Sequence, residues 1–286
     1  MKVVKISNRK KFIIGVIGVI CILVFLYWGN NSIVITKSEY TSTKLPKEFD
    51  QFVIAQISDL HNKKFGNNQN ILLEKLKRTS PDVILVTGDL IDSRRFNLNT
   101  ALDFINGAIQ IAPIYYVSGN HEARSNQYTV IKNALINASV NVLDNDLAKL
   151  TIGSSSIHLL GLMDPYFYAT NQINEKDSTY TQLLEQWSHN DGFQILLSHR
   201  PELFELYAAY NIDMVFSGHA HGGQVRLPFL GGLIAPNQGV LPKYTSGRYD
   251  EENTSMYVSR GLGNSIIPLR IFNRPEIVVI TLKSKQ

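Results

Sequence analysis

Five short motifs rich in aspartate, histidine and asparagine occur along the chain, and each begins where an apolar segment ends. They are Asp59-Leu60-His61, Gly88-Asp89-Leu90-Ile91-Asp92, Gly119-Asn120-His121-Glu122, Ser198-His199 and Gly218-His219-Ala220-His221. In open α/β sheets, the carboxyl ends of the strands line the crevice that binds ligands. If each apolar segment is a strand, we expect all five motifs to meet in space, although they are far apart in the sequence.

From residue 51 onward, the segments between the motifs alternate between strand-like and helix-like patterns. Val83–Thr87 and Ile114–Val117 are short apolar and β-branched runs typical of buried strands, whereas Thr100–Ile111 has helical spacing. Two further apolar segments on either side of Gly153 predict a hairpin. Hairpins mixed with crossover helices indicate an α/β fold: a four-layer α/β/β/α sandwich with mixed sheets, preceded by one N-terminal transmembrane helix.

The residue types in the motifs favour a metal site. Carboxylates that gather in an interior cleft repel one another and are costly to desolvate, so bound cations are the natural compensation. Imidazole nitrogens mixed with carboxylate oxygens suit first-row transition ions better than calcium or magnesium. We therefore expect two divalent metal ions per chain, either manganese, iron or zinc. A thiolate site is excluded, because Cys21 is the single cysteine of the chain.

The motifs match D-x-H, G-D-x-x-D, G-N-H-[DE], H and G-H-x-H, the pattern of the calcineurin-like metallophosphoesterase superfamily, which the chain resembles over roughly residues 50–286. The resemblance is closest to the exported or membrane-anchored bacterial branch, which includes phosphodiesterases and enzymes similar to UDP-diacylglucosamine pyrophosphatase. That branch is also similar in the segments Gly222–Pro228 and Ser259–Asn264. The resemblance implies a metal-dependent phosphoric ester hydrolase. Every element of the pattern is present, which argues against an inactive relative.

The resemblance also implies a ligand set. Asp59, His61 and His221 would bind the first metal ion, Asn120, His199 and His219 the second, and Asp89 would bridge the two. Two ions that share a carboxylate lie about 3.5–4 Å apart, where a bridging hydroxide can attack phosphorus in line with the leaving group. The neutral oxygen of Asn120 leaves the site net positive toward a phosphate.

Two further motif residues have a predicted catalytic role. His121 follows a candidate ligand directly, and adjacent side chains point in different directions, so we expect it to donate a proton to the leaving alkoxide. Asp92 resembles the acidic partner that orients this histidine and raises its pKa. Two alternatives stay open: His121 could bind phosphate without proton transfer, and Asp92 could cap the helical region that follows it. Glu122 is expected to lie outside the ligand set.

Four other residues are predicted to contact the substrate. Arg94 follows the second motif, Tyr166 belongs to an aromatic cluster after a strand, and Arg226 and Lys243 lie in or near the glycine-rich segment 222–239. Long ordered loops of this kind often carry function. The alternatives are a solvated arginine pair for Arg94 and a packing role for Tyr166.

Residues 1–50 predict a membrane attachment. Residues 1–11 form a basic tail, 12–28 an apolar transmembrane anchor, 29–50 a polar tether with one short strand, and 51–286 the metallophosphoesterase catalytic domain. As a helix, residues 12–28 would span about 26 Å, slightly less than a ~30 Å hydrocarbon core. Basic residues before the anchor favour a cytoplasmic N-terminus and an extracytoplasmic catalytic domain at the cell membrane. A cleaved signal peptide is the alternative, but no A-x-A-like site follows Trp28.

These observations indicate a membrane-anchored, dinuclear phosphoesterase that hydrolyses a phosphodiester or pyrophosphate bond of lipid-linked or nucleotide-linked envelope substrates. The alternatives are a broad extracytoplasmic phosphomonoesterase or nucleotide phosphodiesterase, and a non-catalytic metal-binding envelope protein. Basic residues before residue 12 account for the formal charge of +4, so the rest of the chain is near neutral. It therefore lacks the basic footprint of a nucleic-acid-binding domain. The sequence indicates no protein partner.

Overall fold

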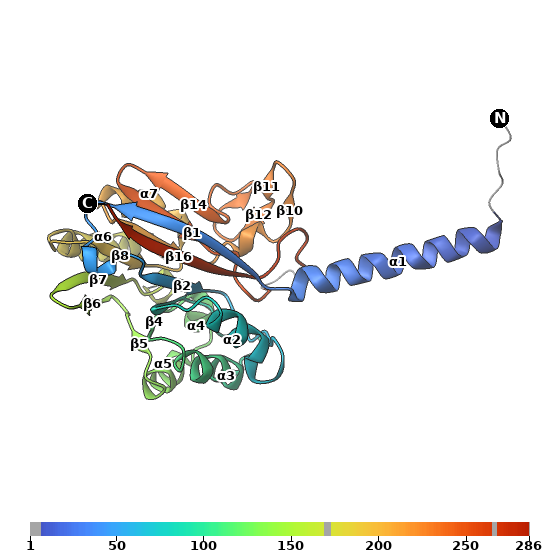
Figure 1. Cartoon of the computed structure of the whole chain (residues 1–286), viewed down its shortest axis with the longest axis horizontal. Helices are drawn as coiled ribbons and strands as arrows, with labels where there is room; N and C mark the ends of the chain where they lie inside the picture. The colour runs from blue at the N-terminus through green and yellow to red at the C-terminus, as the bar shows by residue number, and fades with distance from the viewer. Residues whose placement is uncertain (1–6, 169–172, 265–267, 286) are drawn as a thin grey trace.

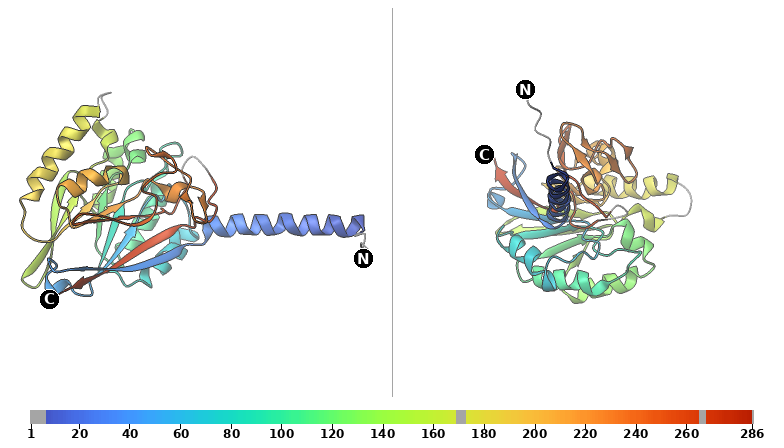
Figure 2. Two further views of the ribbon diagram at one scale, coloured as in Figure 1. Left: turned by 90° about the horizontal axis from the view of Figure 1, so that it is seen from above. Right: turned by 90° about the vertical axis from the view of Figure 1, so that its right-hand side faces the viewer.

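Two six-stranded sheets pack face to face, and helices cover their outer faces (Figures 1 and 2). The computed structural model describes residues 7–168, 173–264 and 268–285, so residues 1–6 of the predicted basic tail lie outside the described residues. Helix α1 (Asn8–Asn31) projects away from the sandwich as one long helix (Figure 1). The predicted four-layer α/β/β/α sandwich with mixed sheets is thereby confirmed.

The first sheet has the strand order β1-β16-β2-β3-β4-β5. Its strands span Val34–Ser42 (β1), Val53–Ile57 (β2), Val83–Thr87 (β3), Ile114–Val117 (β4), Asn141–Val142 (β5) and Glu276–Ser284 (β16). β16 runs antiparallel to β2, and the other neighbours are parallel. Helices α2 (Asn70–Lys77), α3 (Leu98–Ala108) and α5 (Tyr128–Asn137) cover its outer face. With both faces covered, β3 is buried at every position.

The second sheet has the strand order β14-β15-β9-β8-β7-β6. Its strands span Asp146–Ile152 (β6), Ser155–Gly161 (β7), Gln194–Leu197 (β8), Met214–Ser217 (β9), Gly247–Glu251 (β14) and Thr254–Val258 (β15). β6 and β7 form the predicted antiparallel hairpin, and β7, β8 and β9 run parallel. Helices α6 (Ile173–Ser188) and α7 (Phe204–Ala209) lie on the outer face of this sheet.

Three apolar cores hold the four layers together. The middle core lies between the sheets and includes Leu85 and Ile280 from the first sheet and Leu197 and Phe216 from the second. The other two cores lie between each sheet and its helices. Burial of one apolar side chain of this size stabilises a fold by ~1.5–3 kcal/mol. The interlayer packing therefore fixes how the strand ends of one sheet face those of the other.

Shorter elements connect the layers. Helix α4 (Asn120–Arg124) begins soon after β4. After β9, the chain forms two small hairpins, β10 (Arg226–Leu227) with β11 (Gly231–Gly232), and β12 (Ile234–Ala235) with β13 (Gly239–Val240). Short 3-10 helices span Lys47–Phe49, Asn67–Gln69, Pro165–Tyr168, Pro201–Leu203 and His221–Gly223.

The segment predicted as a polar tether with one short strand, residues 29–50, contributes a longer strand that belongs to the first sheet. β1 has nine residues and pairs in parallel with β16 along its whole length. Its exposed polar side chains are explained by its place at the edge of the first sheet, whereas Tyr40 is buried in the middle core. Helix α1 also extends beyond the predicted anchor 12–28 at both ends. The folded domain therefore begins at about β1 and not at residue 51.

Candidate metal centre

The five motifs follow five strands and meet where the two sheets face each other. Asp59, Asp89 and Asn120 come after β2, β3 and β4 of the first sheet, and His199 and His219 come after β8 and β9 of the second. All five side chains belong to buried residues. The sheets thus bring polar groups from both halves of the sandwich into one site, as the position of the motifs in the sequence predicts.

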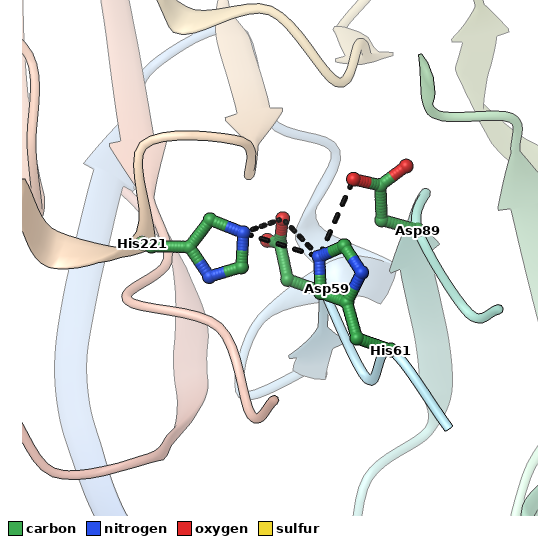
Figure 3. Close-up of side chains that lie close together, drawn as sticks. All are labelled: Asp59, His61, Asp89 and His221. Carbon is green, nitrogen blue, oxygen red and sulfur yellow. Dashed lines mark hydrogen bonds and ion pairs between the residues drawn. The ribbon is translucent and has the colours of Figure 1, made fainter. Parts of the chain in front are cut away.

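A first group of candidate metal ligands consists of Asp59, His61, Asp89 and His221 (Figure 3). His61 Nε2 lies 3.1 Å from His221 Nε2 and 3.4 Å from Asp89 Oδ2. Asp59 Oδ1 lies 3.3 Å from His221 Nε2. Ligand atoms about 2.0–2.2 Å from one ion are separated by ~3.0–3.6 Å in tetrahedral or octahedral geometry. The spacing of these atoms therefore fits a single divalent ion.

A second group consists of Asp89, His199 and His219. His199 Nε2 lies 3.3 Å from Asp89 Oδ2 and 3.2 Å from His219 Nδ1. Asp89 belongs to both groups, because the same Oδ2 atom also lies within 3.4 Å of His61 Nε2. A carboxylate shared between two ligand groups is the arrangement found in two-metal sites.

Asn120 offers a further candidate ligand. Its Oδ1 atom is buried and has no hydrogen-bond partner among the residues that the structure describes. A buried amide oxygen without a partner costs free energy, and a bound cation would satisfy it. Carboxylates, imidazole nitrogens and this amide oxygen are a donor set that fits divalent ions of the manganese, iron or zinc type.

Hydrogen bonds orient several of these side chains. His199 Nδ1 donates to the carbonyl oxygen of Thr87 at 2.7 Å, which leaves Nε2 free to act as a ligand. Ser58 Oγ donates to Asp59 Oδ2 at 2.6 Å. Partners of this kind fix the tautomer of a ligating histidine and hold a carboxylate in place.

The backbone is strained at the candidate ligands. Asp59, His61, Asp89, His219 and His221 all have positive φ, between 47° and 63°. Non-glycine residues in this left-handed region cost of order 1–3 kcal/mol each, and they collect at functional sites. The strain falls on the residues of the two ligand groups, which the surrounding fold must therefore hold in place.

Glycines make room behind the first ligand group. Gly261 has a φ of +69°, and a Cβ atom on it would lie 2.6 Å from Cβ of Asp59. A Cβ atom on Gly263 would lie 2.3 Å from the carbonyl oxygen of Leu60. The segment Ser259–Asn264, whose role the sequence alone did not indicate, therefore supports the turn that carries Asp59.

The pKa values within the groups are shifted by burial and by neighbouring charges. Burial raises the pKa of the Asp89 carboxyl, but His199 and His61 outweigh this effect and hold the pKa well below its usual range. Burial lowers the pKa of His199, but the Asp89 carboxylate raises it to about 10. Burial lowers the pKa of His221 to about 3. The site thus pairs ionised carboxylates with imidazoles, and a proton competes with a metal ion for His199.

Comparison with known proteins decides the family. The sequence model described as Calcineurin-like phosphoesterase matches residues 52–223. The chain belongs to this family. The expected reaction class is thereby confirmed: the protein is a metal-dependent phosphoester hydrolase whose Asp and His groups suit two divalent ions.

Two relatives of known sequence agree with this assignment, and one solved structure has a similar fold. The chain is 29% identical over 296 aligned residues to the metallophosphoesterase YkuE of Bacillus subtilis. This alignment covers 98% of this chain and 99% of YkuE. It is 25% identical over 237 residues to the phosphodiesterase YaeI of Escherichia coli, covering 81% and 82% of the two chains. The solved structure of the phosphopantetheinyl hydrolase PptH of Mycobacterium tuberculosis has a TM-score of 0.50 at 13% identity, over 75% of this chain and 91% of that chain. This last likeness concerns the fold alone.

In this calcineurin-like phosphoesterase, His121 has a different immediate partner from the predicted one. The amide of Ser93 donates to His121 Nδ1 at 3.1 Å, whereas Asp92 Oδ1 lies 3.6 Å from that nitrogen. Burial lowers the pKa of His121 to about 4, although Asp89 and Asp92 act in the opposite direction. The predicted net increase in this pKa does not occur, because burial outweighs the carboxylates. Since Nδ1 accepts a hydrogen bond, the neutral imidazole carries its proton on Nε2.

Asp92 is held by two arginines. Arg94 and Arg95 approach its Oδ2 atom at 3.1 and 2.9 Å, and the Asp92 side chain is buried. Asp92 does not cap the helix that follows, because Asn97 accepts from the amide of Thr100 at the start of α3. Arg94, a predicted substrate contact, is therefore engaged with Asp92.

The other predicted substrate contacts, Tyr166, Arg226 and Lys243, interact with neighbouring residues. The guanidinium of Arg124 lies 4.3 Å from the ring centroid of Tyr166. Arg226 Nη1 donates to the carbonyl oxygen of Gly222 at 2.9 Å, and Lys243 Nζ lies 2.8 Å from Glu205 Oε1. The side chains of Lys243 and Glu205 are both largely exposed, and such surface ion pairs are weak. Contact of these three residues with a substrate stays a prediction.

A buried arginine next to the second ligand group was not predicted. Arg200 directly follows His199 and donates to Asp164 at 2.6 and 2.9 Å. Burial lowers the pKa of Arg200, but Asp164 outweighs this effect and raises it. Arg200 Nη1 also lies 2.8 Å from His219 Nε2, so a charged group stands behind a candidate ligand. Because Arg200 directly follows the motif residue His199, the sequence could have indicated that it lies near the metal centre.

A cavity of about 390 Å³ opens beside the first ligand group. It is lined by His61, Asn62, Lys63, Arg95, Asn97 and Asn264. Two of its wall residues reach the end of α1: Lys63 donates to the carbonyl oxygen of Asn30, and Asn264 Nδ2 lies 3.0 Å from Asn30 Oδ1. Hydrogen bonds from the cavity wall therefore link the first ligand group to the last turn of α1. Asn62 and Lys63 directly follow the first motif, which is the signal that could have indicated them.

Proposed function

We propose that this protein is a membrane-anchored enzyme that hydrolyses a phosphodiester or pyrophosphate bond in a lipid-linked or nucleotide-linked substrate of the cell envelope. The observation that carries the proposal is the position of Asp89 in both ligand groups, because it makes the centre suitable for two ions. The relative YaeI is named a phosphodiesterase, which supports cleavage of a diester. Helix α1 supports attachment to a membrane.

The proposed ligand set uses both groups and the amide oxygen between them. Asp59, His61 and His221 would hold one ion, Asn120, His199 and His219 the other, and Asp89 both. When bound, the two ions supply Lewis acidity and lower the pKa of a coordinated water toward neutrality. The neutral oxygen of Asn120 limits the negative charge of the ligand set, which favours an anionic phosphoester at the centre.

His121 is proposed to act on the leaving group. Its ring lies 4.4 Å from the ring of His61, centroid to centroid, so it borders the first ligand group. The hydrogen bond from the Ser93 amide to Nδ1 leaves the Nε2 proton available. A donor in this position can stabilise the leaving oxygen as negative charge develops on it. Asp92 would support this arrangement through the arginines and the backbone turn next to Ser93.

The membrane attachment rests on the length and composition of α1. Its 24 residues extend about 36 Å, which exceeds a ~30 Å hydrocarbon core. Arg9, Lys10 and Lys11 lie at its N-terminal end, which favours a cytoplasmic N-terminus and an extracytoplasmic domain. A cleaved signal peptide, which would release the domain, shares these features, but no A-x-A-like site follows Trp28.

The reaction can be tested with the purified full-length protein in detergent with manganese. We expect faster hydrolysis of bis-p-nitrophenyl phosphate than of p-nitrophenyl phosphate, and no hydrolysis by the Asp89→Asn variant. Activity on the monoester alone would replace the proposal with the phosphomonoesterase alternative. Two bound ions without turnover of either compound would favour a metal-binding protein.

A further inference from the structure

Exposed apolar side chains gather at the end of the domain from which α1 emerges. They belong to the two small hairpins after β9 and to the segment that precedes β16. Figure 1 places β10, β11 and β12 at this end, and the left-hand view of Figure 2 agrees. We call this set the apolar collar, and it consists of Phe229, Leu230, Val240, Leu241, Leu269 and Phe272.

Three exposed residues of the collar have a strained backbone. Phe229 is fully exposed, and Phe229, Leu241 and Phe272 have φ values of 68°, 54° and 51°. Bulky side chains rarely adopt this left-handed region, and such strain collects at functional sites. Clustered apolar exposure of this kind marks an interaction surface. The collar therefore has the properties of a contact surface and not of a solvated loop.

The collar is continuous with α1 through direct contacts. The ring of Phe272 lies 5.3 Å from the ring of Phe25, which belongs to the apolar part of α1. The amide of Arg226 donates to the carbonyl oxygen of Ile271 at 3.0 Å, which ties the β10–β11 hairpin to the same segment. If α1 crosses a bilayer, Phe272 lies at the depth of Phe25, and the rest of the collar lies beside it.

Other residues at this end suit the boundary between lipid and water. Trp28 follows Phe25 by one helical turn, and the guanidinium of Arg274 lies 4.4 Å from the Trp28 ring centroid. Tryptophan is enriched at membrane interfaces, and arginine there faces the lipid headgroups. The aromatic and basic residues thus mark the headgroup level just outside the collar.

The cavity beside the metal centre opens at the same level. Its wall residues Lys63 and Asn264 both bond to Asn30, two residues beyond Trp28. A headgroup that enters the cavity from the membrane would pass Lys63 and reach His61 without leaving the interface.

We propose that the apolar collar inserts into the membrane that α1 crosses and sets the cavity at headgroup level, so that the substrate is a phosphoester in the headgroup of a membrane lipid. This inference rests on the proposed function, specifically on the anchoring by α1. The collar acts by adding a second attachment point. One helix leaves the domain free to rotate, whereas the helix and collar together hold the cavity against the bilayer.

The depth of the collar can be measured with the full chain in vesicles of phosphatidylglycerol and phosphatidylcholine. In a Cys21→Ser background, Phe229→Cys carries an environment-sensitive fluorophore, and doxyl-labelled lipid serves as quencher. We expect a blue-shifted, lipid-quenched signal. The matched control is Val130→Cys on α5, which is also exposed and apolar but belongs to a helix away from α1 (Figure 1). The proposal is overturned if the label at position 229 is quenched no more than the label at position 130. This result is expected if a protein partner, and not lipid, covers the collar.

The effect on substrate use can be measured with two compounds that release the same p-nitrophenol. We expect the Phe229→Asp, Leu230→Asp double variant to lose at least about tenfold in rate on dioleoylglyceryl p-nitrophenyl phosphate in vesicles. Its rate on soluble bis-p-nitrophenyl phosphate should stay at the wild-type level, and Val130→Asp should change neither rate. Equal losses on both compounds would overturn the proposal. If the wild type cleaves neither compound, the proposed function fails, whereas the quenching experiment still decides the position of the collar.

Discussion

The Oδ2 atom of Asp89 lies 3.3 Å from the Nε2 atom of His199, and this contact joins the two sheets at the candidate metal centre. Asp89 follows β3 of the first sheet, and His199 follows β8 of the second. The other ring nitrogen of His199 donates to the carbonyl oxygen of Thr87, the last residue of β3. The metal centre and the packing of the two sheets therefore depend on each other.

The Asp89→Asn substitution should remove both ions. An amide lacks the negative charge of the carboxylate whose Oδ2 atom lies close to His61 in one ligand group and to His199 in the other. Replacement of an outer partner of a metal ligand already costs ~10–100-fold in affinity, so we expect a loss above about hundredfold. Metal content per chain, measured by mass spectrometry after dialysis, should fall well below two, and diesterase activity should vanish. A variant that keeps both ions would contradict the shared position of Asp89.

The His121→Ala substitution should separate catalysis from metal binding. We expect metal content to stay close to that of the wild type, because the proposed ligands are left in place. Loss of a general acid or of an equivalent donor lowers the rate by ~10²–10⁴-fold. The measurement is kcat on bis-p-nitrophenyl phosphate with metal content determined on the same sample. Equal metal loss in His121→Ala and Asp89→Asn would show that His121 is a ligand.

The metal centre could be predicted from sequence because its signal is local. Each candidate ligand follows a short apolar run, and strands of this kind end at one edge of a sheet. The sequence pattern therefore predicts that Asp59, Asp89 and His219 meet without any knowledge of the tertiary contacts. The layered fold follows from the same alternation of strands and helices.

The features that sequence did not predict depend on contacts between distant segments. The sequence predicts a short strand in residues 29–50, but the full length of β1 and its place in the first sheet depend on its pairing with β16, in which Val34 lies opposite Glu276. The partner of His121 is the amide of Ser93, a backbone group that carries no sequence signal. The collar is likewise not apparent from the sequence, since its segments are joined only in the folded chain, where the amide of Arg226 donates to the carbonyl oxygen of Ile271. At His121, burial lowers the pKa more than the nearby carboxylates raise it, and this balance can be judged only in the packed structure.

Lys63 should make stability depend on pH. Burial lowers the pKa of Lys63 to about 7, and Arg270 acts in the same direction. In the unfolded chain a lysine has a pKa of about 10.4, so between about pH 7 and 10 the unfolded state binds more protons. The free energy of unfolding should therefore rise with pH across this window. Melting curves at several pH values should show a flatter dependence for Lys63→Met than for the wild type. The exposed Lys37→Met is the control, and an unchanged slope in Lys63→Met would contradict the assignment.

The Gly261→Ala substitution should damage the metal centre and not merely the backbone. Gly261 has a φ of +69°, and a Cβ atom there would lie 2.6 Å from Cβ of Asp59. Gly153 has a similar φ of +59°, but its Cβ atom would meet nothing within 4 Å. Both alanine variants should lose about 1 kcal/mol through the left-handed backbone. Only Gly261→Ala should also displace Asp59, and with it lose metal affinity and diesterase activity. Metal titrations and melting temperatures of the two variants separate these effects. If Gly153→Ala loses as much metal affinity as Gly261→Ala, the loss comes from general destabilisation and not from the contact with Asp59.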